Sequence, residues 1–166
     1  MSFTTTYVVL CGEVMMSVTI EVAGIATDEL LAGLNKLLPQ LSTTAPALKL
    51  ADLERVIRSP SITLFVASDN DEVIGSLTLA MFPIPTGVRA WIEDVVVDGS
   101  SRGAGVGEAL IGAAINEARR SNARSIDLTS RPDRESANGL YKKIGFEQRH
   151  TNVYRFLVQP PGDDSQ

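Results

Sequence analysis

Hydrophobic residues along the chain follow two spacings, one typical of strands and the other of helices. Residues 17–24 alternate apolar and polar side chains, as a half-buried strand does. Residues 27–41 place leucines three and four positions apart behind Thr27, a residue type that caps helices. Pro39 is expected to end this helix, and a second, shorter helix is predicted over 50–59.

The rest of the chain continues this alternation of strand and helix patterns. A hairpin is predicted over 61–82, where the polar turn Asp69–Asp71 separates two apolar-rich runs. The remaining predicted elements are a strand over 88–98, a helix over 104–121, a strand over 125–130, a helix over 133–144 and one or two strands over 146–158. This order predicts one α/β domain around a mixed, mostly antiparallel sheet.

Length and composition are those of one globular domain. The chain has 166 residues, of which 44% are hydrophobic and 21% charged, with a net charge of −5. Met15 and Met16 stand directly before the first strand pattern, so we expect residues 1–14 to be an extension upstream of the domain. The domain is then expected to span 15–158, and the polar tail 159–166 to be disordered.

Charge and cysteine content narrow the classes of partner and compartment. The negative net charge argues against a nucleic-acid-binding surface, and no apolar run approaches the roughly 20 residues that span a bilayer. We therefore expect neither nucleic acid nor membrane as a partner. The single cysteine, Cys11, cannot form an internal disulfide, which favours a cytoplasmic location. The single histidine, His150, cannot build a multi-histidine site, so no metal is expected.

A glycine-rich turn joins the strand pattern at 88–98 to the helix pattern that follows. Its glycines are Gly99, Gly103, Gly105 and Gly107. Glycines allow a phosphate oxygen to approach the backbone, and a helix N-terminus offers unpaired N–H groups, so the turn suits a pyrophosphate. The turn has no lysine for a Walker motif, and Glu108 and Leu110 stand where a dinucleotide motif needs its last glycine. From spacing alone, the glycines could instead only shape a loop.

Two motifs here resemble the GCN5-related N-acetyltransferases, the GNAT family. RGAGVG (102–107), preceded by IEDVVVD, matches the family's acetyl-CoA signature Arg/Gln-x-x-Gly-x-Gly/Ala. ANGLYKKIGF (137–146) matches its second motif, with Leu-Tyr followed by Gly-Phe. The resemblance implies a single-domain fold with a mixed sheet of about six to seven strands and about four flanking helices. It also implies an enzyme that uses acetyl-CoA as acyl donor.

The resemblance further implies a role for individual residues. Backbone amides of the turn would hold the CoA pyrophosphate, and a strand edge would pair with the pantetheine arm and polarise the thioester carbonyl. The turn residues are Arg102, Gly103, Ala104, Gly105, Val106 and Gly107, and the edge residues are Val95, Val96 and Val97. Asn138 would contact CoA from the next helix. Tyr141 would contact the CoA sulfur and protonate the leaving thiolate, or it could simply pack in an amphipathic helix.

The acceptor amine must lose a proton, and Glu93 is the first candidate for the base. Asp94 lies on the opposite strand face, so only one of the two carboxylates can face a given pocket. Trp91 either lines the acceptor pocket or packs in the core. Thr129 stands where the protein N-terminal-acetylating branch commonly has glutamate, so a small-molecule amine or aminosugar is favoured as acceptor. The alternatives are a protein or peptide amine, or a non-catalytic CoA-binding module. By analogy with relatives, a homodimer is possible.

Overall fold

The computed structural model describes residues 4–11 and 14–158. It divides into two compact units, with the boundary between Arg131 and Pro132. The first unit holds β1 (Thr4–Cys11), β2 (Val14–Val22), α1 (Asp28–Leu41), α2 (Leu50–Arg58), β3 (Ile62–Asp69), β4 (Glu72–Ile84), β5 (Gly87–Val97), the short 3₁₀ helix η1 (Gly99–Ser101), α3 (Val106–Arg120) and β6 (Ser125–Leu128). The second unit holds α4 (Glu135–Ile144).

The strands of the first unit form one sheet in the order β1-β2-β3-β4-β5-β6. Neighbouring strands are antiparallel except β5 and β6, which are parallel. The β3–β4 hairpin turns through Asn70 and Asp71, both at positive φ, which is typical of a two-residue hairpin turn. This confirms the turn predicted at Asp69–Asp71. Within the described residues, a mixed, mostly antiparallel sheet of six strands and four α-helices confirm the predicted fold class.

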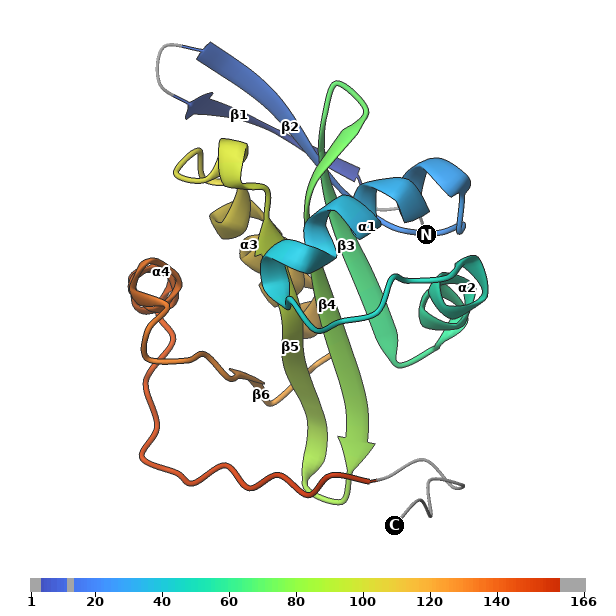
Figure 1. Ribbon diagram of the computed structural model, residues 1–166. Coiled ribbons are helices and arrows are strands. Elements are labelled where there is room, and N and C mark those ends of the chain that lie inside the picture. The colour runs from blue at the N-terminus through green and yellow to red at the C-terminus, as the bar shows by residue number, and fades with distance from the viewer. Residues whose placement is uncertain (1–3, 12–13, 159–166) are drawn as a thin grey trace. The chain divides into compact units, whose positions relative to one another are not determined.

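Helices cover both faces of this sheet. Figure 1 shows α1 in front of the central strands, α2 beside β3 and α3 behind the strands. On the front face, Leu64 and Val66 of β3 pack in one cluster with Leu34 of α1 and Leu53 of α2. Phe65 lies between them in the sequence and is also fully buried, because successive strand residues point to opposite faces. The core therefore has two layers, one on each side of the sheet.

Gly75 on β4 lets α3 approach the sheet closely beside β5. A Cβ at this position would lie 3.2 Å from Leu110 Cδ1 and 3.4 Å from Val106 Cγ1, both on α3. It would also lie 3.1 Å from the Val96 carbonyl oxygen on β5. Because α3 begins at Val106, this close packing fixes where the helix N-terminus meets the sheet.

The prediction of one or two strands over 146–158 was wrong. The structure has no strand in this segment, and Val153, Tyr154 and Phe156 are 75%, 88% and 88% exposed. The alternation of apolar and polar residues shows only that these side chains would suit the two faces of a strand. A strand also needs a neighbouring backbone to pair with, and none of the described strands pairs with these residues.

Two further predictions concern where elements begin and end. Pro39 does not end the first helix, because α1 runs on to Leu41 and closes with a 2.9 Å bond from the Ser42 N–H to the Leu38 carbonyl. A proline so close to a helix end removes only one of the last backbone bonds. Residues 4–11 pair with β2 as strand β1, and the domain boundary at residue 15 stays a prediction.

The predicted tail at 159–166 lies outside the described residues. Of the helices in the described segments, none is long and apolar enough to cross a membrane.

Candidate active site

A bulge interrupts the pairing of β4 and β5 at the predicted catalytic strand. Ser76 on β4 opposes Val96 on β5, but Thr78 opposes Glu93, so β5 carries one residue more than β4 in this interval. Within the bulge, Asp94 has a φ of 50°, in the left-handed region that aspartate tolerates better than most residues. Such bulges bend a strand and redirect its side chains. Glu93 therefore lies where β5 changes direction.

Beyond the bulge, β5 has an open edge. Parallel pairing with β6 runs from Arg89, opposite Ser125, to Ile92, opposite Leu128, and stops there. Among the described strands, none pairs with the β6 side of residues 93–97, although β4 still pairs with the other side. This stretch contains Val95, Val96 and Val97, the residues expected to line the pantetheine arm. The backbone groups that point to this side are therefore not paired with another described strand, although the Val97 carbonyl accepts from the Arg102 side chain.

The glycine-rich turn follows this edge directly and leads into α3. Gly103 and Gly105 both have a φ of 81°, and Gly105 caps the helix. Ala104 and Val106, between and after them, are only 3% and 1% exposed and hold the turn on the core. The backbone amides of the first helical turn have no acceptor within the helix and carry the positive end of its dipole. The turn can therefore bind an anion through its backbone.

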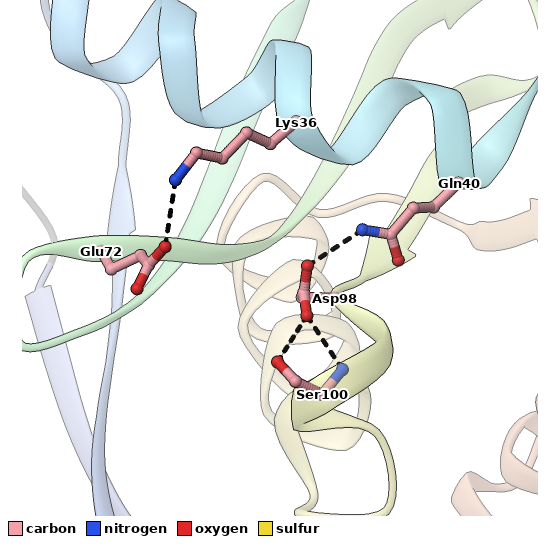
Figure 2. A network of polar contacts seen from close by, with 5 residues as sticks. All are labelled: Lys36, Gln40, Glu72, Asp98 and Ser100. Atoms are coloured by element: carbon pink, nitrogen blue, oxygen red, sulfur yellow. Dashed lines mark hydrogen bonds and ion pairs between the residues drawn. The ribbon is translucent and has the colours of Figure 1, made fainter.

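A polar network holds the start of this turn to α1. Figure 2 shows Gln40 beside Asp98, and the Gln40 Nε2 donates to Asp98 Oδ2 over 2.9 Å. The Gly99 N–H in turn donates to Gln40 Oε1 over 3.0 Å. Asp98 Oδ1 accepts from both the backbone N–H and the hydroxyl of Ser100. The Ser100 hydroxyl, then Gln40 and the Ser100 backbone, lower the pKa of Asp98 to about 2.

A second contact of α1, also drawn in Figure 2, joins Lys36 to Glu72 at the β3–β4 hairpin, with 3.1 Å between Nζ and Oε1. Both side chains are 67% exposed, so solvent screens this pair and its contribution to stability is small. The contacts of Gln40 and Lys36 thus tie α1 to the start of the turn and to the β3–β4 hairpin, respectively.

Asp98→Asn is expected to remove part of the acid sensitivity of the fold. The pKa of Asp98 is about 2 when folded, against 3.8 as the reference value, so its ionisation favours the native state above pH 3.8. That stabilisation is lost as the pH falls from 3.8 towards 2. Calorimetry over this interval should show the Tm of the wild type falling more steeply than that of Asp98→Asn. Glu72→Gln serves as the control, and equal slopes for Asp98→Asn and the wild type would contradict the prediction.

Trp91 and Glu93 lie on the same face of β5, opposite to Ile92. The Trp91 indole Nε1 donates to Glu93 Oε1 over 2.7 Å, and the Glu93 side chain is exposed. Ile92, between them, points to the opposite face and is 2% exposed. Trp91 is half-buried and its indole N–H bonds to an exposed carboxylate, so both interpretations of Trp91 stay predictions.

The second unit carries Asn138 and Tyr141, three positions apart on α4 and so on neighbouring parts of the helix surface. Tyr141 makes an edge-to-face contact with Phe146, with 6.0 Å between ring centroids. Burial raises the pKa of Tyr141 above its usual 10.0, and the positive charge of Arg134 opposes this shift. The phenol is therefore protonated at neutral pH and able to donate a proton.

Sequence reasoning missed Gln40, which lies 58 residues from Asp98 and carries no motif. It also gave no sign of the left-handed conformation of Asp94. Within the described segments, no three His, Cys, Asp or Glu side chains are grouped so that they could hold a metal ion.

Two curated relatives are named as acetyltransferases. L-2,4-diaminobutyric acid acetyltransferase of Marinococcus halophilus is 32% identical over 91 residues, which are 55% of this chain and 52% of that protein. Glucosamine 6-phosphate N-acetyltransferase of Trypanosoma brucei brucei is 38% identical over 101 residues, which are 58% of this chain and 65% of that protein. The matches thus span just over half of one relative and just under two-thirds of the other.

The fold is shared with solved acetyltransferases. The structure of the aminoglycoside N-acetyltransferase AAC(6')-Iy in complex with CoA superposes with a TM-score of 0.73, covering 89% of this chain and 99% of that chain. The two sequences are 18% identical, so this likeness shows the fold alone.

The family profile described as the acetyltransferase (GNAT) family matches residues 30–146, which is more than half of the chain. The matched range includes the glycine-rich turn, the bulged strand β5 and Tyr141. This chain therefore belongs to the GNAT family of acetyltransferases.

Proposed function

We propose that this protein is an N-acetyltransferase that transfers the acetyl group of acetyl-CoA to a primary amine of a small molecule, with an aminosugar among the favoured acceptors. The observation that carries the proposal is the unit of bulged strand, open edge, glycine-rich turn and helix N-terminus, all contiguous over residues 93–107. Family membership and the names of the two relatives support the reaction and the acceptor class.

The residues of this unit fit CoA as a donor. Backbone amides from Arg102 to Gly107 bind the pyrophosphate, because Gly103 and Gly105 keep side chains away from the anion. The open edge at Val95–Val97 pairs with the amide groups of the pantetheine arm. Arg102 contributes chiefly through its backbone, since its side-chain Nε donates to the Val97 carbonyl over 3.3 Å. Membership of the GNAT acetyltransferase family supports this choice of donor.

Transfer proceeds by direct attack of the neutral amine on the thioester carbonyl carbon. A C–N bond forms, the C–S bond breaks, the amine proton passes to a base, and the thiolate takes a proton from an acid. Glu93 is the base, directly or through a water, because its carboxylate is exposed beside the bulge. Tyr141 is the acid, since its raised pKa keeps the phenol protonated. Asn138 contacts the bound CoA from α4.

Thermal denaturation with acetyl-CoA, CoA, NADH and ATP tests the donor. A ligand at a hundred times its Kd stabilises a native site by about 2.7 kcal/mol, so we expect a clear rise in Tm with the two CoA forms alone. Release of free thiol from acetyl-CoA is then measured with 2,4-diaminobutyrate, glucosamine 6-phosphate and aminoglycosides. Stabilisation without thiol release from any amine would support a CoA-binding module, and equal stabilisation by NADH would refute the donor assignment.

A further inference from the structure

The strand β5 presents a row of polar side chains on the face opposite its buried residues. Trp91 and Glu93 are two positions apart, so their side chains leave the same side of the strand. Across the sheet, Thr78 of β4 opposes Glu93, and Asp127 of β6 opposes Trp91. The bulge begins immediately after Glu93. Trp91 and Glu93 therefore lie where the pairing of β5 with β6 ends.

The contact between Trp91 and Glu93 is directional. The distance of 2.7 Å from Nε1 to Oε1 lies at the short end of the range for an N–H bound to a carboxylate. An indole nitrogen donates one hydrogen bond and accepts none, so it can hold only an acceptor oxygen. An exposed glutamate side chain otherwise samples several rotamers. The indole thus restricts Glu93 to one orientation and engages one of its two oxygens.

The guanidinium of Arg89, on the same face of β5, is already paired with an acidic side chain. Arg89 Nη1 lies 3.0 Å from Asp127 Oδ2 and donates to Ser125 Oγ over 3.0 Å. Among the described residues, no ion pair involves Glu93. The indole N–H carries no net charge, so it orients the Glu93 carboxylate and leaves its negative charge uncompensated. A carboxylate in this state attracts a cation.

We propose that Trp91 is a positioning residue for the acceptor: its indole N–H holds one oxygen of Glu93 and leaves the other free for the incoming amine. The proposal rests on the proposed function and specifies its acceptor side. The acceptor class that fits is a primary amine that arrives as an ammonium ion on a sugar ring or carbon chain. The ammonium meets the uncompensated carboxylate, and the indole face attracts the same cation.

A double-mutant cycle tests whether Trp91 acts through Glu93. Trp91→Phe keeps an aromatic ring and removes the N–H, whereas Glu93→Gln removes the charge. We expect Trp91→Phe to lower kcat/KM for the amine about tenfold with an unchanged KM for acetyl-CoA, as the loss of one charge-assisted bond implies. In a protein that already carries Glu93→Gln, adding Trp91→Phe should leave kcat/KM for the amine almost unchanged. The proposal would be overturned if Trp91→Phe lowered kcat/KM equally in the wild-type protein and in the Glu93→Gln variant, or did not lower it in either protein.

A second measurement needs no catalytic activity, so it separates this inference from the proposed function. The chain has one tryptophan and therefore one indole N–H resonance. We expect this proton to resonate downfield and exchange slowly in the wild type, and to move upfield and exchange faster in Glu93→Ala. Glu72→Ala, which removes an exposed carboxylate from β4, is the control and should leave the resonance unchanged. An indole resonance insensitive to Glu93→Ala would refute the pairing even if acetyl transfer is observed.

Discussion

Replacing Gly105 with glutamate is expected to abolish stabilisation of the protein by acetyl-CoA. Gly105 has a φ of 81° and caps the N-terminus of α3. A side chain in this left-handed conformation costs about 1–2 kcal/mol, and the added carboxylate repels the pyrophosphate. Wild-type protein should gain about 2.7 kcal/mol from a ligand at a hundred times its Kd. Thermal denaturation with and without acetyl-CoA therefore measures the loss directly.

Gly112→Glu is the matched control for this change. Position 112 lies on the same helix, and a Cβ there would have nothing within 4 Å, so the same side chain should be accepted without loss of ligand binding. Gly105→Asn separates the effect of the left-handed backbone from the effect of the added charge. Asparagine tolerates the left-handed region and adds no negative charge. We expect it to weaken acetyl-CoA binding less than glutamate does. Full stabilisation of Gly105→Glu by acetyl-CoA would show that the turn does not hold the donor.

The parts of the site that the sequence predicted are those formed by neighbouring residues. Thr27 caps α1 as expected, with its hydroxyl accepting the Leu30 N–H over 3.2 Å. The turn at 102–105 and the start of α3 follow from glycines next to a helical pattern, because both are local in the chain. Local periodicity thus predicted most of the strand and helix order, and with it the place of the turn.

Long-range contacts and backbone irregularities could not be predicted in this way. Gln40 reads as an ordinary polar residue near a helix end, and only the fold brings it to Asp98 and Gly99. The bulge at Asp94 depends on the register between β4 and β5, which strict alternation along β5 does not reveal. Strand formation over 146–158 likewise depends on a pairing partner, which side-chain alternation cannot supply. These three misses therefore all concern contacts between segments that are distant in the sequence.

Tyr141→Phe is expected to lower kcat by roughly a hundredfold to ten-thousandfold, the usual contribution of a general acid, while stabilisation by acetyl-CoA is retained. Phenylalanine preserves the ring that contacts Phe146 and removes only the hydroxyl. The wild-type rate should not fall through loss of this acid at neutral or mildly alkaline pH, because the pKa of Tyr141 is raised above 10.0 and the acid form persists. Thiol release measured against pH in both proteins tests this.

Tyr154→Phe makes the same chemical change in a side chain that is 88% exposed, and it should leave both kcat and the acetyl-CoA effect unchanged. Comparing the two variants separates loss of the reacting hydroxyl from any general effect of removing a tyrosine oxygen. A Tyr141→Phe protein that keeps the wild-type kcat would mean that solvent protonates the thiolate. A variant that also loses stabilisation by acetyl-CoA would instead show that Tyr141 holds the donor, because binding precedes the proton transfer assigned to its hydroxyl.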